Sequence, residues 1–210
     1  MKALALLVLV GCGSYSTYRT TKIVPAGQTE WLFGAQATGT SAPGQGGAPM
    51  PELSAGARRG VGDRYEVQAS GTMLALPQLV TGSLEVAGKL RVVQHGRWSL
   101  AVGAAAGYRL AESGGAIVEG AHVAAPVIFG IDLGRHQLVL AATGGYQRWH
   151  SSGAQPVAAP FIGESIGFRW QVGERWALLP EIGAAYTPMS NFMTPDSRLF
   201  HVGLAATFTR

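Results

Sequence analysis

The chain has 210 residues, of which 47% are apolar, 13% are charged and 30 are glycines, and its net charge is +4. At this length a single domain is expected. The charged share is about half that of an ordinary soluble domain and the glycine content about twice the average, which excludes a disordered chain and argues against a cytosolic enzyme. The longest apolar run, Ala3–Val10, is too short for a membrane-spanning helix of about 20 residues. The remaining membrane-spanning architecture is a closed β-barrel.

Several classes of partner have no signature in the sequence. Only three of the 16 basic residues are lysines, and the arginines gather into no patch, so we expect no nucleic-acid partner. The five histidines fall in five separate segments without zinc-ligand spacing. The glycine-rich stretch 44–47 lacks the following helix and Lys-Ser/Thr of a phosphate-binding loop. We therefore expect neither a metal nor a cofactor.

The first residues have the pattern of a targeting signal. Met1-Lys2 is positively charged, an apolar stretch follows, and the chain then reads Leu9-Val10-Gly11-Cys12. This order resembles a bacterial lipoprotein signal, which implies cleavage before Cys12 and a diacylglycerol on its thiol, and Gly13 implies delivery to the outer membrane. Each buried CH₂ of an acyl chain contributes about 0.8 kcal/mol to anchoring. We therefore expect a signal peptide at 1–11 and a flexible tether at 12–27; an ordinary secretory signal that contains a cysteine is the alternative.

The rest of the chain alternates between apolar and polar residues with period two, as half-buried strands do. The connections between these segments are alternately short and long, and this pattern with an even strand count is typical of a transmembrane barrel. We predict an all-β fold over residues 28–210, an antiparallel up-and-down transmembrane β-barrel of about ten strands, with both termini at the short-turn, periplasmic side. The expected strands cover about residues 28–39, 51–59, 64–75, 81–94, 97–110, 117–132, 136–149, 157–172, 175–187 and 198–209.

Aromatic residues of the apolar phase fall near strand ends, with aliphatic and small residues between them. Two aromatic girdles around an aliphatic band suit a bilayer, whereas a soluble lipocalin-like barrel or a sandwich has no reason to sort its aromatics in this way. The architecture resembles small Gram-negative outer-membrane β-barrels, and the last strand, Phe200–Phe208, is similar to the C-terminal signal read by the barrel-insertion machinery, although Thr209-Arg210 follow it. The expected girdle residues are Trp31, Tyr65, Trp98, Trp170, Trp176 and Phe208 at one level and Tyr108, Tyr146, Tyr186 and Phe200 at the other.

The opposite phase of the strands carries charges in nearly balanced numbers. In a barrel of about ten strands, such charges are expected to pair across the interior, because an unpaired buried charge is costly. A filled or narrow lumen follows, and a narrow small-solute pore is an alternative. The expected lumen residues are Glu30, Gln36, Glu52, Ser54, Arg58, Arg64, Glu66, Gln68, Ser70, Glu85, Lys89, Arg91, Arg109, Arg169, Glu181 and His201.

One polar cluster lies on the phase expected to face lipid. If the hairpin after the seventh strand centres near Val157, His150 lies opposite Glu164, with Ser152 close by. The preceding hairpin brings Glu119 beside His150. A carboxylate, an imidazole and a hydroxyl in this arrangement are what a serine hydrolase needs.

The order His150-x-Ser152 followed by Glu164 resembles the lipid A deacylase family, which implies Ser152 as nucleophile, His150 as base and Glu164 as its orienting group. The resemblance covers about fifteen residues, and Gly153 stands where that family has an asparagine. The other interpretation is that residues 150–153 begin an exposed loop and that Glu119 and Glu164 mark rim positions or bulges near Pro126 and Pro160, where strand phase is prone to slip.

The function expected from the sequence is that of an outer-membrane β-barrel lipoprotein with a structural or surface-binding role. We expect a monomer with a lipid-anchored, periplasmic N-terminus, whose partners are outer-membrane lipids and the barrel-insertion machinery. An esterase acting on lipid A at the rim and the narrow pore are the alternatives, so the sequence leaves an enzymatic role open.

Overall fold

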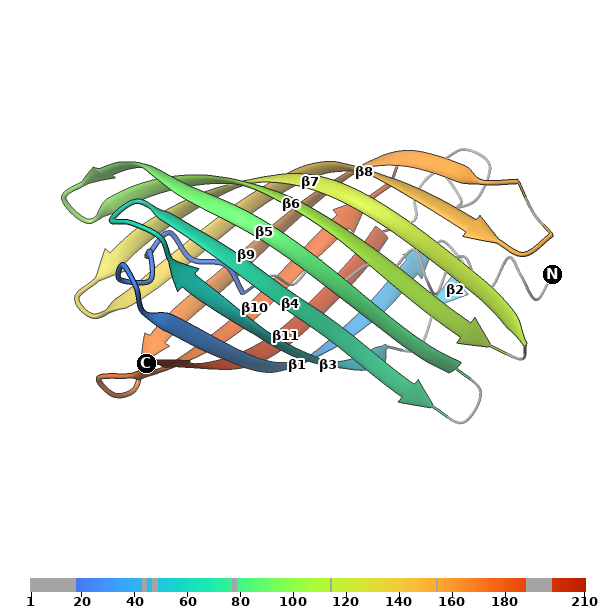
Figure 1. Ribbon diagram of the computed structural model, residues 1–210, viewed down its shortest axis with the longest axis horizontal. Helices are drawn as coiled ribbons and strands as arrows, with labels where there is room; N and C mark the ends of the chain where they lie inside the picture. The colour runs from blue at the N-terminus through green and yellow to red at the C-terminus, as the bar shows by residue number, and fades with distance from the viewer. Residues whose placement is uncertain are drawn as a thin grey trace.

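The computed structural model describes residues 18–42, 45–46, 49–76, 79–113, 115–153, 155–187 and 198–210. Ten long antiparallel strands form a closed barrel, because each pairs with the next and the last returns to the first (Figure 1). The ten-stranded, all-β prediction is confirmed. The strands are β1 (Thr29–Ala42), β3 (Met50–Gly60), β4 (Tyr65–Leu76), β5 (Leu79–His95), β6 (Trp98–Ser113), β7 (Ala116–Leu133), β8 (His136–Ser151), β9 (Val157–Gln171), β10 (Trp176–Tyr186) and β11 (Arg198–Thr209), with the two-residue β2 (Gln45–Gly46) against the end of β1.

The connections divide the barrel into a short-turn end and a long-loop end. Gly96 and Gly134, in two of the short turns, have φ values of 53° and 67°, a conformation that glycine adopts without strain. The C-terminus lies at the short-turn end (Figure 1), where the Thr29 amide donates to the Arg210 carbonyl at 2.9 Å. In the part of the chain that the structure describes, no helix is long and apolar enough to span a membrane.

Several strands continue further toward the long-loop end than predicted. Residues 111–113, expected in a loop, pair with β5 and with the start of β7. Pairing continues there because each further residue satisfies its backbone groups. The register also runs unbroken through Pro126, opposite Thr143, and Pro160, opposite Tyr146, so the bulges suggested near these prolines are not present.

The outer face has the predicted aromatic girdles. Trp31 is 47% exposed and Trp176 is 49% exposed, and both lie opposite Phe208 in the register, so these three rings form a row across β1, β11 and β10 at the short-turn end. At the other end Tyr146 and Tyr186 are also exposed. Exposed aliphatic side chains lie between the two levels, as expected for a barrel whose outer face contacts lipid.

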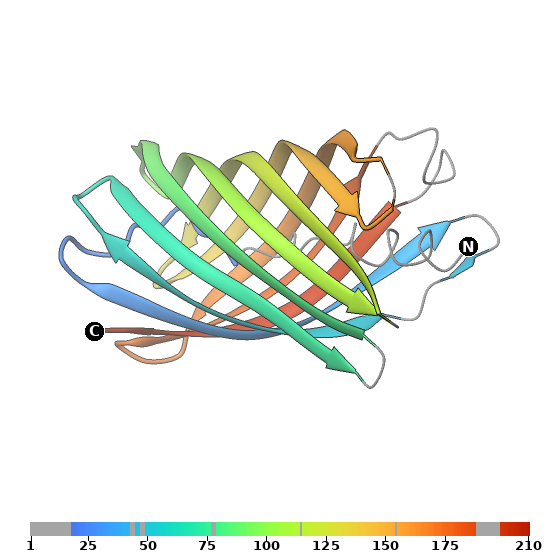
Figure 2. The same ribbon diagram turned by 45° about the vertical axis from the view of Figure 1, so that its right-hand side comes forward.

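Residues 18–24 lie inside the barrel, which corrects the prediction of a flexible tether for this part of 12–27. In chain order it runs from Tyr18 inside the barrel to Val24 near the end that carries the C-terminus (Figures 1 and 2). Thr21 is fully buried. Its amide donates to the side-chain oxygen of Gln137 at 3.2 Å, and its hydroxyl oxygen lies 2.5 Å from that of Ser99. The Val24 amide donates to Glu66 at 3.0 Å. We refer to residues 18–24 as the lumen segment.

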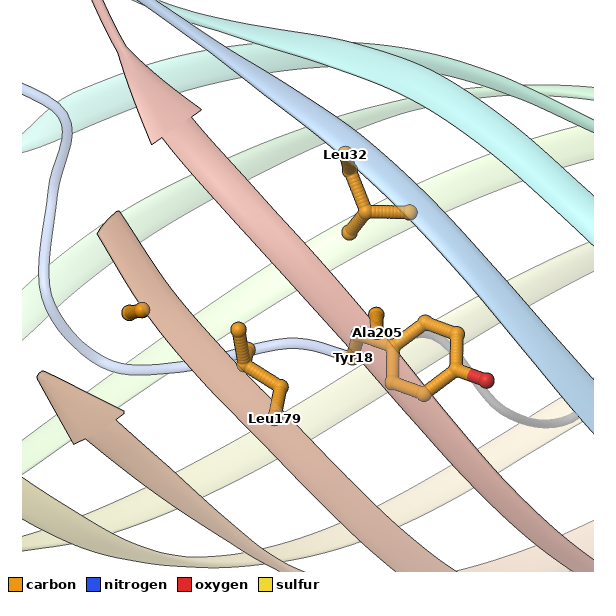
Figure 3. Close-up of a cluster of buried hydrophobic side chains, with 5 residues drawn as sticks. Tyr18, Leu32, Leu179 and Ala205 are labelled. Atoms are coloured by element: carbon orange, nitrogen blue, oxygen red, sulfur yellow. The ribbon is translucent and has the colours of Figure 1, made fainter. Parts of the chain in front are cut away.

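The first described residue packs where the barrel closes. Tyr18 is 2% exposed, and its ring lies against Ala205, with Leu32 and Leu179 on either side (Figure 3). Its hydroxyl donates to the Ala35 carbonyl at 3.0 Å. A Cβ at Gly203 would overlap that hydroxyl, so glycine there makes room for the ring. The N-terminal side of the chain thus packs on the seam between β1, β11 and β10.

We expect Gly203→Ala to lower the free energy of unfolding by about 1–3 kcal/mol, because the new methyl group overlaps the Tyr18 hydroxyl. The Tyr18→Phe background should reduce this cost, since the overlapping atom is gone; coupling of about 0.5–3 kcal/mol is typical of residues in contact. Urea unfolding of the folded protein in micelles measures both. Gly144→Ala is the control, since a Cβ there meets nothing within 4 Å. Equal costs of Gly203→Ala in both backgrounds would contradict the packing.

Candidate functional site

In the short-turn half of the lumen, ion pairs of the barrel wall also bind the lumen segment. Glu30, 3% exposed, accepts from Arg58 at 3.3 Å and from Arg169 at 2.8 Å. Lys89 lies 2.8 Å from Glu66. Lys89 also donates to the carbonyls of Thr20 and Lys22, at 2.6 and 2.9 Å, and Arg58 donates to the Tyr18 carbonyl. The basic side chains of the wall therefore bind the segment through its backbone.

The middle of the lumen contains a chain of paired charges. Arg19 of the lumen segment lies 2.9 Å from Glu85 of β5, whose other oxygen is 3.2 Å from His122 of β7. Arg109 of β6 pairs with Glu52 of β3, nearer the long-loop end of the lumen. Pairing across the interior, which the sequence predicted, is confirmed for these groups, since mutual neutralisation offsets the cost of burying them.

Two cavities lie on either side of the Arg19 side chain. The larger, of about 80 Å³, is lined by Tyr18, Arg19, His122, Trp149 and Phe161 among others. The smaller, of about 10 Å³, extends toward the short-turn end and is also lined by Arg19. The lumen segment therefore leaves a hollow toward the long-loop end and little space in the other half.

The predicted rim cluster is only partly assembled. His150 and Glu119 are direct register partners, as expected, and Ser152 lies exposed in the turn that follows β8. The Glu119 carboxylate accepts a hydrogen bond from the Tyr108 hydroxyl on the outer face. A carboxylate and an imidazole are thus adjacent, but the carboxylate accepts a hydrogen bond from a phenol.

Glu164 does not belong to this cluster, which corrects the predicted pairing. Trp149 pairs with Val157, so the hairpin centres on Gly153, whose φ of 81° suits a tight turn, and not near Val157. Moving the centre by four residues moves every partner by eight, and Glu164 lies opposite Ala142. It is exposed on the outer face of β9, out of reach of His150.

The lumen segment supplies functional residues that the sequence analysis missed. Arg19 and Lys22 were assigned to a tether, yet Arg19 pairs with Glu85, and Lys22 lies 3.7 Å from Asp132. A signal was present, since the stretch from Tyr18 to Lys22 has no glycine, proline or serine, the residues that make a linker flexible. Among the residues that the structure describes, no group of three or more metal-ligating side chains is found.

We expect Glu30→Leu to lower the free energy of unfolding by about 3–5 kcal/mol, because it leaves the guanidinium groups of Arg58 and Arg169 buried without their shared carboxylate. Urea unfolding in micelles measures the effect. Glu112→Leu is the control, since Glu112 is exposed on the outer face of β6. Similar losses for the two variants would show that the lumen pairs do not hold the barrel together.

No protein-family model matches the chain, and a search of curated proteins finds no match. The fold is similar to three solved structures. These are the translocator domain of the autotransporter NalP from Neisseria meningitidis (TM-score 0.52, 8% identity, 99% of this chain and 94% of that chain covered), the outer membrane protease OmpT from Escherichia coli (0.54, 8%, 92% and 100%) and an outer membrane channel from Pseudomonas putida F1 (0.53, 10%, 90% and 98%). Identities this low show a shared fold alone. The chain therefore has the fold of the outer-membrane β-barrels.

Proposed function

We propose that the chain is an outer-membrane β-barrel lipoprotein whose lumen is closed by its own lumen segment and which has a structural or surface-binding role. The outward band of exposed aliphatic residues between aromatic girdles supports the membrane assignment. The fold shared with outer-membrane barrels agrees with it.

The proposal of a closed lumen rests on the number of strands that the lumen segment contacts. Side chains of β3, β4, β5, β6 and β8 form hydrogen bonds with residues 18–24. Thr20, Thr21 and Val24 are 6% exposed or less. A solute would have to displace a peptide that is tied by hydrogen bonds to side chains of five of the ten long strands, so a narrow pore is less favoured.

The register of β8 and β9 argues against an esterase built from Ser152, His150 and Glu164, because Glu164 lies opposite Ala142. A triad would have to use Glu119 instead, and this carboxylate already accepts a hydrogen bond from Tyr108. Ser152 also stands in a turn, beyond the last paired residue of β8. We therefore favour the structural or surface-binding role.

The closed lumen is tested by replacing residues 19–22 with Gly-Ser-Gly-Ser, which removes the Arg19 and Lys22 ion pairs and leaves all ten strands intact. In planar lipid bilayers we expect the wild type to show no steady conductance and the variant to open, because the segment loses its side-chain contacts with Glu85, Ser99 and Asp132 and keeps only bonds to its backbone. The control makes the same replacement at residues 61–64, in a turn outside the barrel. Steady wild-type conductance, or a folded variant that stays closed, would contradict the proposal.

Lipidation of Cys12 is part of the same proposal, although the residue lies outside the described part of the chain. Tyr18 follows it by six positions, and an extended chain of that length spans at most about 20 Å. Because Tyr18 lies inside the lumen, an anchor on the periplasmic side, which we assign to it, requires residues 13–17 to lead back toward the short-turn end.

Metabolic labelling with a fatty acid should tag the wild type and not Cys12→Ala, because only the thiol carries the diacylglycerol. Cys12→Ser is the matched variant, since serine keeps the size of the side chain without the thiol. The barrel of both variants should remain folded, since the ten long strands that pair to close it lie between Thr29 and Thr209. An unlabelled wild type with a mature N-terminus elsewhere would refute lipidation.

A further inference from the structure

We propose that four arginines at the short-turn end, which we call the arginine belt, bind the phosphate groups of anionic phospholipids in the leaflet around that end. They are Arg64, Arg97, Arg135 and Arg175. The inference rests on the membrane assignment of the proposed function and adds a class of ligand to it. The arginines gather into no patch along the sequence, but the closed barrel brings these four to one end of the molecule.

The same two-residue pattern occurs at all four short turns. Each turn ends in an exposed arginine, and the next residue is an aromatic side chain that begins the following strand. The turns lie together at the end that carries the C-terminus (Figure 1). The four pairs are Arg64-Tyr65 before β4, Arg97-Trp98 before β6, Arg135-His136 before β8 and Arg175-Trp176 before β10.

The arginine belt is spread evenly around the barrel. Its turns join β3 to β4, β5 to β6, β7 to β8 and β9 to β10, so neighbouring turns are two strands apart. At the remaining interval, the seam between β11 and β1, the exposed Arg210 follows β11. A lipid leaflet surrounds a barrel on all sides and can meet every one of these cations, whereas a protein docked on one side would meet only some of them.

The aromatic residues set the depth of the arginine belt. Tyr65, Trp98 and Trp176 are exposed on the outer face, at the level where aromatic girdles meet the headgroups. One further residue advances the chain by about 3.4 Å, and the headgroup layer adds about 5–8 Å to each side of the hydrocarbon core. The Arg97 guanidinium carbon lies 5.2 Å from the centre of the Trp98 ring, which places this cation on the lipid-facing side of the barrel.

The arginine belt has no carboxylate partner among the described residues, although acids lie close to it. Asp63 precedes Arg64 and Glu174 precedes Arg175, yet neither acid forms an ion pair within the described part of the chain. Asp132, near the turn between β7 and β8, pairs with Lys22. A guanidinium group binds a phosphate through two parallel hydrogen bonds, so phosphate is a ligand that these groups can take.

The long-loop end has no such excess of positive charge in the part of the chain that the structure describes. Apart from His150, the charged residues on its outer face are two arginines and two glutamates, Arg148, Arg198, Glu112 and Glu119. Their formal charges cancel. The asymmetry between the two ends therefore favours anionic lipids at the short-turn end, which is periplasmic in the proposed topology.

The test uses the tryptophan fluorescence of the full barrel in vesicles, which brominated lipids quench on contact. Trp31, Trp98, Trp170 and Trp176 are exposed at the end that carries the arginine belt, so they report which lipids lie beside it. Brominated phosphatidylglycerol is compared with brominated phosphatidylcholine. An arginine at an anionic surface favours binding by about fivefold. We expect a phosphatidylglycerol preference of at least about fivefold, which should fall at high salt because exposed charges are screened.

The variant with Arg→Gln at all four belt positions should bring this ratio close to one. It should fold, because the four side chains are exposed. The matched control carries Arg148→Gln and Arg198→Gln at the long-loop end and should keep the wild-type ratio. Each ratio compares two lipids on the same protein, so a change in the intrinsic fluorescence of Trp98 cancels.

A wild-type ratio near one, an unchanged ratio in the belt variant, or an equal loss in the control would overturn the proposal. Replacing chloride by inorganic phosphate at equal ionic strength should leave the preference unchanged; its abolition would show a site for small anions and not for lipids. Absence of quenching by both lipids would instead contradict the membrane assignment, so the two failures are distinguishable.

Discussion

The structure depends on the binding of a peptide backbone by basic side chains inside the barrel. Arg58 and Lys89 donate to carbonyls of the lumen segment, and Glu30 and Glu66 hold these two cations in place. A wall of ten strands leaves an interior too wide for its side chains alone to fill easily. The segment fills the short-turn half, and the charged groups that it meets would otherwise be buried without enough partners.

A second constraint is the use of glycine beneath large inward side chains. His122 lies over Gly107, and His201 over Gly183, in the same way that Trp149 lies over Gly120. Each ring covers the backbone of the adjacent strand, which protects the strand pairing and keeps the ring out of the centre of the lumen. The high glycine content of the chain therefore has a structural role within the strands as well as in the turns.

The sequence predicted the strands and the outer face well because both depend on local alternation. It failed where the outcome depends on distant contacts. The register between β8 and β9 is set by the turn at Gly153, and a misplaced turn centre put Glu164 beside His150. The burial of Thr21 comes from Gln137, 116 residues away, which no local pattern could show. The near balance of charges in the lumen was predicted, but the pairing of Arg19 with Glu85 was not.

The lumen segment also constrains how the barrel can be assembled. Residues 18–24 contact strands from both halves of the chain, and Tyr18 packs on β1, β10 and β11, the first strand and the last two to emerge during synthesis. The hydrogen bonds of the segment need strands only up to β8, but the Tyr18 ring cannot reach its final packing until the last two strands have arrived. Closing the seam and burying Tyr18 are therefore coupled, and the barrel wraps around a peptide that precedes its own first strand.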